Sequence, residues 1–442
     1  MAIFLDGPSS HPSGWRTSLL SALLVCVLGV VVSPQVQLDV CGCKNSPASL
    51  GSFDTADAAT YPPGTIMTNI NAMEIPLPAD GVMVFNNLNL VERPGYVGYG
   101  LTIRFIRNAA NTPVTLLVAG NVTIGTRVQL VVSGDNGVTG STNDLGKGGL
   151  GGPGGFRGAD GGYQLVNFGA RGGTGLGPGG GAGGADTYYN SGHGAGATFL
   201  GAPDLLPLVG GSGGGGGAST ELRPGCSGGG GGGGGGALLL GVNGTLTLEG
   251  QIVGDGGNAG NWADASCSSS GGGGSGGAVR VLATTINGSG QVYARAGAGG
   301  TPTAQMGSIR LEALNNTLTV GNTTPLAARA AGPGPIVNPI TPTVAITTVG
   351  GQAVPQPPQG GLGNVDLVLP APGQTDVGLA TTGVPTGTTV NVTVKPKVGG
   401  LPIVTPVTLT SCDTNGACLA NVTFNLAAGA YFVEARATFA TP

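Results

Sequence analysis

The composition of this chain limits what it can do. Among its 442 residues are 91 glycines, and Asp, Glu, Lys and Arg together make up only 9% of the sequence. Soluble globular proteins contain about 25% charged residues, so an ordinary globular enzyme is not expected. The 17 basic and 21 acidic residues leave no electrostatic surface for nucleic acid. Disorder accompanies low hydrophobicity, whereas this chain is 40% hydrophobic, which favours a rigid all-β protein.

An apolar run near the N-terminus predicts export. It spans residues 18–32 and follows Arg16, and it is shorter than the roughly 20 residues that a membrane span needs. We therefore expect residues 1–33 to be an export signal and the protein to be extracellular or at the cell surface. No small-residue cleavage motif lies near Pro34, so a retained N-terminal anchor is the alternative, and it would be the protein's contact with a membrane.

The cysteines agree with an oxidising compartment. Of the 7 cysteines, Cys26 lies inside the apolar run, and the others make an even number, as in a disulfide-bonded secreted protein. Their spacing suggests three pairs, although other connectivities remain open: Cys41 with Cys43, Cys226 with Cys267, and Cys412 with Cys418. The pair that is separated by one residue can instead form a bond between two chains.

The first segment after the apolar run, residues 34–113, has no helical periodicity. Its apolar residues alternate as in strands at 81–90 and 100–106. An open end of a stacked β-structure needs a cover, because unpaired backbone recruits other chains. We expect residues 34–113 to provide that cover.

Residues 114–326 contain an internal repeat in which two short β-rich runs are followed by glycines. The copies are residues 114–137, 237–257, 278–300 and 308–322. A strand of about five residues cannot bury its apolar face alone, so such repeats are stabilised by stacking one copy on the next. The repeat predicts a parallel β-solenoid, with a sandwich built from the same strands as the alternative.

Aligning the copies predicts which residues lie side by side. Leu238, Val279 and Ile309 share one column, and the next column consists of Leu239, Arg280 and Arg310. Side chains alternate across a strand, so we expect the first column to face the core and the second to face solvent.

The second column offers a candidate ligand-binding face. Arg280 and Arg310, extended by Arg104 in the run 101–106, would place guanidinium groups on one flat surface, which is suited to an anionic polysaccharide. The alternative, which we prefer, is a solvated column whose charge deters aggregation.

Residues 145–236 form a glycine-rich insertion that ends in the run 228–236. A flexible linker is one interpretation. Apolar side chains threaded through the segment, such as Phe156, favour instead a compact unit of extended glycine strands with three residues per turn, because only glycine lets backbones approach so closely. A Cys226–Cys267 disulfide would stabilise this unit.

The composition changes again at residues 327–342, where proline and small residues predict a stiff hinge. Residues 343–442 contain short alternating strands separated by Gly, Pro and Asn turns, which is typical of an immunoglobulin-like β-sandwich. Cys412 and Cys418 would join the two strands of one hairpin. No tryptophan lies in this part, so an antibody-type core is not expected.

The runs GALLLGVNGTLTLEGQIVGDGG and AVRVLATTINGSGQVYARAGAGG resemble uncharacterised glycine-rich secreted proteins of bacteria. The resemblance covers residues 114–442 and implies a right-handed parallel β-helix, followed from Ala353 by the immunoglobulin-like domain that often accompanies it. The insertion is similar to the polyglycine bundles of phage tip adhesins and of a receptor-kinase ectodomain. No active site comes with the resemblance.

Catalytic constellations are scarce in the sequence. With 2 histidines in the chain, neither a Ser-His-Asp triad nor a histidine-rich metal site is expected. The acidic residues of the repeats do not occupy matching positions, which argues against paired-carboxylate cleavage of glycans. Turn chemistry explains Asp135, Asp160 and Asp255 beside glycines, so a structural calcium site is only a weak alternative, and we predict no catalytic residue or cofactor.

These observations predict a non-enzymatic structural or adhesive protein of the cell surface, whose partner would be a cell-surface or matrix polysaccharide. Low charge and many strand edges favour self-association, so a subunit of a self-assembling extracellular filament is the alternative. A glycan-active β-helix enzyme is a distant third hypothesis.

Overall fold

The computed structural model describes residues 39–141, 146–163, 170–185, 192–219, 227–261, 269–336, 343–355, 366–396, 401–413 and 417–437. Some predictions concern residues outside these ranges and are therefore not addressed by the structure. They are the export segment, the Cys226–Cys267 disulfide and the end of the predicted hinge. The described residues form β-strands, with two short 3-10 turns at Ala58–Thr60 and Val320–Asn322 and no α-helix. The prediction of an all-β fold is confirmed.

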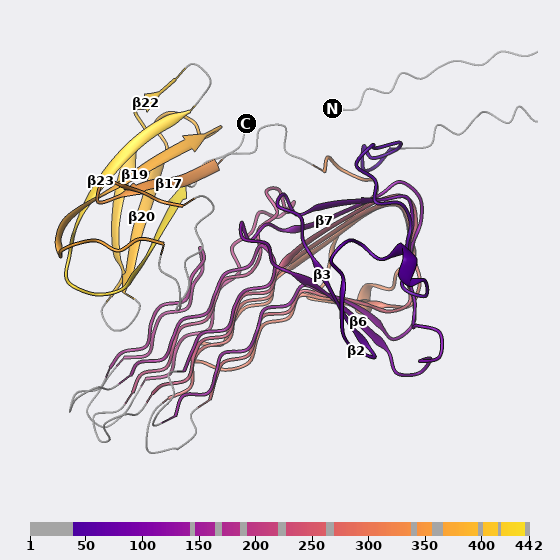
Figure 1. The fold of residues 1–442 in the computed structure, drawn as a ribbon, viewed down its shortest axis with the longest axis horizontal. Helices are drawn as coiled ribbons and strands as arrows, with labels where there is room; N and C mark the ends of the chain where they lie inside the picture. The colour runs from indigo at the N-terminus through magenta and orange to yellow at the C-terminus, as the bar shows by residue number, and fades with distance from the viewer. Residues whose placement is uncertain are drawn as a thin grey trace, which may run out of the picture. The chain divides into compact units, whose positions relative to one another are not determined.

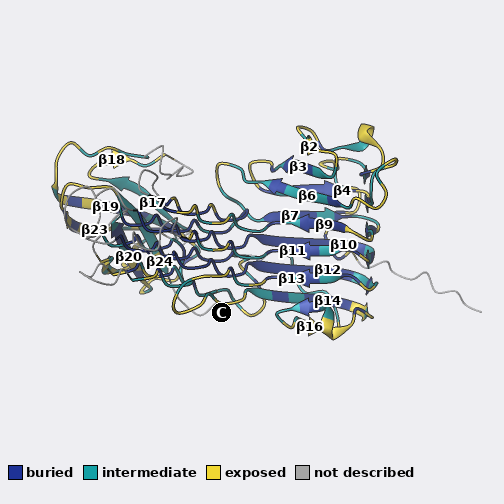
Figure 2. Cartoon of the chain, turned by 90° about the horizontal axis from the view of Figure 1, so that it is seen from below, coloured by how far each residue is buried: buried dark blue, intermediate teal, exposed yellow. Residues whose placement is uncertain are grey.

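The repeat region and the segment before it build two largely parallel sheets, which we call the parallel stack (Figures 1 and 2). The first sheet contains β1 (Phe53–Asp54), β4 (Val82–Phe85), β5 (Leu88–Leu90), β7 (Val114–Val118), β8 (Val122–Ile124), β10 (Ala237–Leu248), β12 (Ala278–Asn287), β14 (Ser308–Asn316) and β16 (Ala328–Ala330). The second contains β2 (Ile66–Asn69), β3 (Ala72–Pro76), β6 (Leu101–Ile106), β9 (Val128–Val131), β11 (Gln251–Val253), β13 (Gln291–Tyr293) and β15 (Thr323–Thr324). Only the β2–β3 pair is antiparallel among these strands.

The register predicted from the repeat is confirmed. Leu238 on β10 pairs with Val279 on β12, and Val279 pairs with Ile309 on β14. Figure 2 shows the strands one above another from β3 to β16. The copies therefore pair in parallel, each on the next.

One hydrophobic core fills the space between the two sheets. Its side chains come from alternate positions of nearly every strand, and among them are Leu240, Val281, Leu311, Leu130, Ile252 and Val292. Each is at most 1% exposed, and burying a side chain of this size stabilises the fold by about 1.5–3 kcal/mol. Leu, Ile and Val suit this position because their branched side chains pack on a pleated surface.

Residues 53–113 are more than a cover for the stack. β4 pairs with β7, β5 with β8 and β6 with β9, all in parallel. This segment therefore adds further strands to both sheets. At the end of the second sheet, β2 turns back against β3.

The outer face of the first sheet is covered, which makes the prediction of a solvated second column wrong. Leu239 and Arg280 are 3% and 2% exposed. Val40 precedes the strands of the stack in the chain and Ile336 follows them, and both pack with Leu239 and Leu282 in a second apolar cluster. Period-two alternation identifies the face of a strand but not what lies over it.

The glycine-rich segments and their hydrogen-bonded neighbours form a unit that we call the glycine bundle (Figure 1). It includes residues 132–138, 149–162, 211–217, 228–236, 254–260 and 269–277. Successive backbone amides along residues 228–236 donate in turn to three segments, 156–162, 269–275 and 132–138. Every third amide therefore donates to the same segment. Carbonyl oxygens of 228–236 accept from three further segments, 149–152, 211–217 and 257–260. This period of three is that of an extended polyglycine helix.

The bundle is larger than the predicted insertion at 145–236. Segments 132–138, 254–260 and 269–277, which flank the repeat strands, also belong to it. Side chains have no room inside: a Cβ added to Gly231 would overlap the carbonyl oxygen of Gly214. Glycine is therefore required here for close backbone approach.

The remaining strands form two antiparallel sheets. One contains β17 (Thr343–Val349), β18 (Gln352–Ala353), β19 (Gly373–Thr382), β22 (Ser411–Cys412) and β23 (Cys418–Leu426), and the other contains β20 (Thr389–Pro396), β21 (Ile403–Thr408) and β24 (Tyr431–Ala437). Val377, Leu379 and Val392 belong to their shared core. A disulfide joins Cys412 on β22 to Cys418 on β23, within one sheet.

Candidate ligand-binding groove

Arg280 and Arg310, the arginines of the predicted anionic-ligand face, belong to a buried ion cluster. Arg280 Nε donates to Glu312 Oε1 at 2.9 Å, and Arg310 Nε donates to the same oxygen at 2.6 Å. The other oxygen of Glu312 accepts from the backbone amide of Gly334 at 2.6 Å. Arg280 and Glu312 are 2% and 1% exposed, so Arg280 cannot meet a ligand.

Arg104 lies elsewhere and does not extend that column. It is on β6 of the second sheet, where its guanidinium contacts Asp135 at 2.8 Å. The three arginines therefore do not share one exposed face, and the prediction that they do is wrong. Residues 101–106 alternate as the strands with Arg280 and Arg310 do, but they form β6 of the second sheet, whereas those strands belong to the first sheet.

The ion cluster sets the protonation of Glu312. Burial raises the pKa of this carboxyl group, while hydrogen bonds from Arg280, from the Gly334 amide and from Arg310 lower it, and the net pKa lies below the ordinary value of 4.5. Glu312 is thus ionised near neutral pH, and it ties residues 332–336 to the first sheet through Gly334.

The aspartates considered for calcium are each paired with an arginine. Asp135 contacts Arg104, Asp255 contacts Arg295, and Asp160 contacts Arg157. An arginine that neutralises each carboxylate removes the charge a hard cation needs. These three aspartates do not form a shared cation site.

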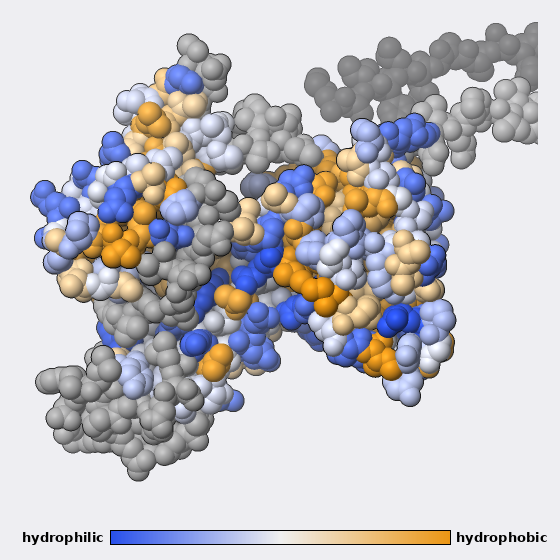
Figure 3. All heavy atoms as spheres, viewed as in Figure 1, coloured by the Kyte–Doolittle hydropathy of each residue, from blue (hydrophilic) through white to orange (hydrophobic). Residues whose placement is uncertain are grey.

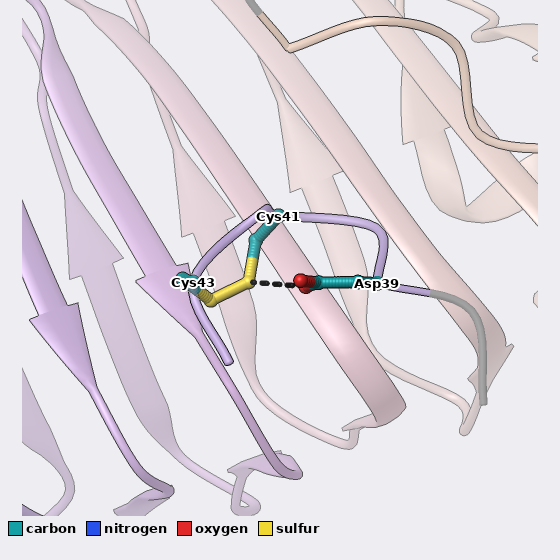
Figure 4. A group of neighbouring side chains, drawn as sticks. All are labelled: Asp39, Cys41 and Cys43. Carbon is teal, nitrogen blue, oxygen red and sulfur yellow. Dashed lines mark hydrogen bonds between the residues drawn. A yellow bond between two sulfur atoms is a disulfide. The ribbon is translucent and has the colours of Figure 1, made fainter. Parts of the chain in front are cut away.

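One group of described residues has metal-ligand types close together, namely Asp39, Cys41 and Cys43 (Figure 4). A disulfide joins the two cysteines, so neither sulfur is the thiolate that a metal binds. The dashed contact from Cys41 Sγ to Asp39 Oδ1 measures 3.9 Å, and a disulfide sulfur carries no hydrogen to donate.

The Asp39–Cys43 segment instead attaches to β10 through Asn243. The Cys41 amide donates to Asn243 Oδ1 at 2.9 Å, and Asn243 Nδ2 donates to Asp39 Oδ1 at 2.8 Å. Cys41 and Cys43 pack with Val84 in an apolar cluster. This arrangement is a structural attachment.

A polar groove of about 460 Å³ lies on the outer face of the second sheet, at the beginning of its strands. Thr102, Gln129, Gln251 and Gln291 line its floor from β6, β9, β11 and β13, which Figure 2 shows one above another. Tyr99, Arg127, Glu249 and Ser289 stand at its sides. Its size is within the range of small-molecule binding sites.

The floor of the groove is a ladder of glutamine side chains. Gln129 Nε2 donates to Gln251 Oε1 at 2.8 Å, and Gln251 Nε2 donates to Gln291 Oε1 at 3.0 Å. The three residues are Cα partners in the parallel sheet, so their amides repeat with the strand spacing of about 4.8 Å. Each amide keeps hydrogen-bonding capacity beyond the ladder.

The wall of the groove is held by Glu92. Its Oε1 accepts from the amides of Gly98 and Gly100 at 3.0 and 2.6 Å. These two hydrogen bonds, that from Gly100 first, lower the pKa of the Glu92 carboxyl group. Between the two glycines, Tyr99 projects at the rim with 67% of its surface exposed.

On the face of the molecule that Figure 3 shows, the hydrophobic residues do not merge into one patch. Figure 3 shows them in separate groups over the end of the stack that carries β2, β3 and β6, with hydrophilic residues between. Ile66, Ile70 and Val97 are among the exposed ones. Scattered apolar residues of this kind are normal on a protein surface.

The glutamine column was missed from sequence, although the repeat contains a signal for it. Gln251 and Gln291 begin the second run of their copies, and Gln129 is the second residue of its run; each is followed by apolar residues, as in QLVV, QIVG and QVYA. Aligning the second runs as well as the first would have shown this column.

Comparison with known proteins finds no matching family model, no matching curated protein and no matching solved structure. Within the described residues, none of the helical segments is long and apolar enough to cross a membrane. The fold and the site therefore define the class of this chain by themselves: an all-β protein of parallel and antiparallel sheets that has a polar groove on one parallel sheet.

Proposed function

We propose that this chain is a non-enzymatic structural or adhesive protein that works outside the cell, at a cell surface. The observation that carries the proposal is the glycine bundle, in which backbone hydrogen bonds link neighbouring segments on all sides of residues 228–236. Ordering so much glycine costs a large conformational entropy. Rigidity of this kind is useful in a support that must keep its shape.

The fold proposed for this support is a right-handed parallel β-solenoid followed by an immunoglobulin-like sandwich. The parallel pairing of β8, β10, β12 and β14 and the single core between two sheets support the first part. The antiparallel strands β17–β24 with their own core support the second. Disulfides at Cys41–Cys43 and Cys412–Cys418 agree with an oxidising environment outside the cell.

The charged groups support a non-enzymatic role. General acids and bases need an accessible group whose pKa is tuned to its task. Here the buried acids are held by arginines, as in the Arg157–Asp160 and Arg280–Glu312 pairs. Glu249, at the groove, accepts from both the amide and the hydroxyl group of Ser289.

Immunogold labelling of the producing cells tests the proposed location. We expect gold particles on the outer surface when intact cells are treated with an antibody against residues 343–442. Labelling that appears only after the cells are permeabilised would contradict the proposal. An antibody against a cytoplasmic protein is the control for intact cells.

A filament subunit is the second candidate, because the end of the stack offers a free strand edge. Among the strands that the structure describes, β16 pairs with β14 alone, and beside it Leu326 is 71% exposed. An unpaired edge is a template for another chain. Negative-stain microscopy of the purified protein separates the candidates: long uniform fibres favour the filament, and discrete particles favour the adhesive monomer.

A further inference from the structure

We propose that the groove over the glutamine ladder binds a neutral polysaccharide chain. The inference rests on the proposed adhesive function and names the ligand class of its site. It concerns the outer face of the second sheet, where Gln129, Gln251 and Gln291 form the floor and Tyr99 the rim.

The floor matches a ligand that both donates and accepts hydrogen bonds at regular intervals. Gln291 Nε2 has no acceptor and Gln129 Oε1 no donor among the described residues, so the ladder ends in a donor at one side and an acceptor at the other. Sugar hydroxyl groups act as donor and acceptor together. A polymer of sugar units would meet the same amide on each strand along the stack.

The charges in the groove argue against an anionic ligand. Among the described residues that line the groove, Arg127 is the one cationic side chain, and the Glu249 carboxylate lies in the same lining. A polyanion would have to approach Glu249, which repels it, with one guanidinium group as compensation. A neutral chain meets no such cost.

The rim supplies an apolar surface of the kind that ligand sites combine with a few polar groups. Tyr99 is exposed, yet the loop that carries it is fixed by the two amide hydrogen bonds to Glu92. An aromatic ring presents a rigid contact surface at a low cost in conformational entropy. We assign Tyr99 the role of covering the apolar face of a sugar ring above the ladder.

A peptide is a poorer occupant. Peptides that bind to sheets add a strand at an exposed edge and use backbone hydrogen bonds. The groove instead crosses the middle of the second sheet, where β9 and β11 each have a neighbouring strand on both sides. Its floor offers side-chain amides rather than free backbone groups.

Affinity electrophoresis of the full chain tests the inference. The gels contain dextran, galactomannan or xyloglucan as neutral polysaccharides, or polygalacturonate as the acidic one. We expect at least one neutral polysaccharide to retard the protein, and polygalacturonate to have no effect. Tyr99→Ala should weaken the retardation at least about tenfold, as the loss of an aromatic anchor does, and Gln251→Ala should do so to a similar degree.

Two matched variants control for unspecific effects. Val97→Ala removes a neighbouring side chain of the same loop that is 74% exposed and does not line the groove. Gln374→Ala removes an exposed glutamine on β19. Both should bind as the unchanged protein does. Tyr99 is 67% exposed, so its variant should keep the native melting temperature and remain informative if Gln251→Ala misfolds.

Three outcomes would overturn the inference: no neutral polysaccharide retards the protein, only polygalacturonate does, or Tyr99→Ala binds as tightly as Val97→Ala. Such a result is distinguishable from failure of the proposed function. If the immunogold label still lies on the outer surface, the protein remains a surface protein whose groove does not bind glycans. A label inside the cell would contradict the function itself.

Discussion

The parallel stack and the glycine bundle are packed in opposite ways: side chains fill the stack, whereas the bundle leaves no room for side chains. In the stack, side chains such as Leu240 and Val281 fill the space between two sheets, and each is fully buried. In the bundle, the neighbours of residues 228–236 approach so closely that no side chain fits between them. Dispersion and the hydrophobic effect dominate in the first region, and backbone hydrogen bonds in the second.

The two regions are joined without a break in the chain. Residues 228–236 of the bundle lead directly into β10 (Ala237–Leu248) of the stack. Each copy of the repeat therefore packs on the next through the side chains of its strands, and also through the backbone hydrogen bonds of its glycine segment. The register set by the leucine and valine columns therefore also aligns the glycine segments.

The largest loss of stability is expected when a core side chain of the parallel stack is shortened. Leu240→Ala leaves a cavity in a core where the side chain is 0% exposed, and we expect it to lower the free energy of unfolding by about 4 kcal/mol. Chemical denaturation of the full chain measures the change. Leu314→Ala, at a position that is 55% exposed, should have little effect. Equal losses for the two variants would show that the stack has no close-packed core.

Adding a carbon atom should damage the bundle. Gly231→Ala places a methyl group against the carbonyl oxygen of Gly214, and overpacking of this kind costs about 3 kcal/mol. Hydrogen exchange should reveal faster exchange of amides across 211–217 and 228–236. Gly321→Ala is the control, because a Cβ there meets nothing within 4 Å. If both variants exchange alike, the bundle is not packed as described.

A smaller loss is expected at the ion cluster on the outer face of the first sheet. Glu312→Gln removes the charge that Arg280 and Arg310 share, and the loss of charged hydrogen bonds costs about 2 kcal/mol. Glu249→Gln, at an exposed glutamate, should change the free energy of unfolding much less. Comparable losses would mean that the buried cluster contributes no more than a surface charge.

The pH dependence of that variant sharpens the test. The pKa of Glu312 is lowered in the folded protein, so its contribution is fully present above the ordinary value of 4.5 and is lost as pH falls through the folded-state pKa. The difference in melting temperature between the unchanged protein and Glu312→Gln should therefore be largest near neutral pH and shrink below about pH 4.5. A constant difference from pH 7 to pH 3 would contradict the assigned protonation.

Local sequence patterns were sufficient to predict the repeat strands and the order in which they pair. Alternation in runs such as 237–240 and 278–281 predicted strands, and the repeat predicted that Leu238, Val279 and Ile309 lie side by side, as they do. The dense glycine predicted backbone-to-backbone packing. These features depend on residues near one another in the chain or on the repeat itself, and for that reason they could be predicted from the sequence.

Which faces of the sheets are covered, and which loop stands beside the glutamine column, depends on how distant segments of the chain pack. Arg280 is buried beside Glu312 of the neighbouring strand, where the segment with Gly334 and Ile336 lies over the outer face of the first sheet. The groove combines the loop at Tyr99 with glutamines from β9 to β13. The segments that complete these two arrangements lie outside the repeat: residues 332–336 over the first sheet, and the loop at Tyr99 beside the glutamines. Alternation tells the two faces of a strand apart, but the neighbours of each face follow from how the whole chain packs.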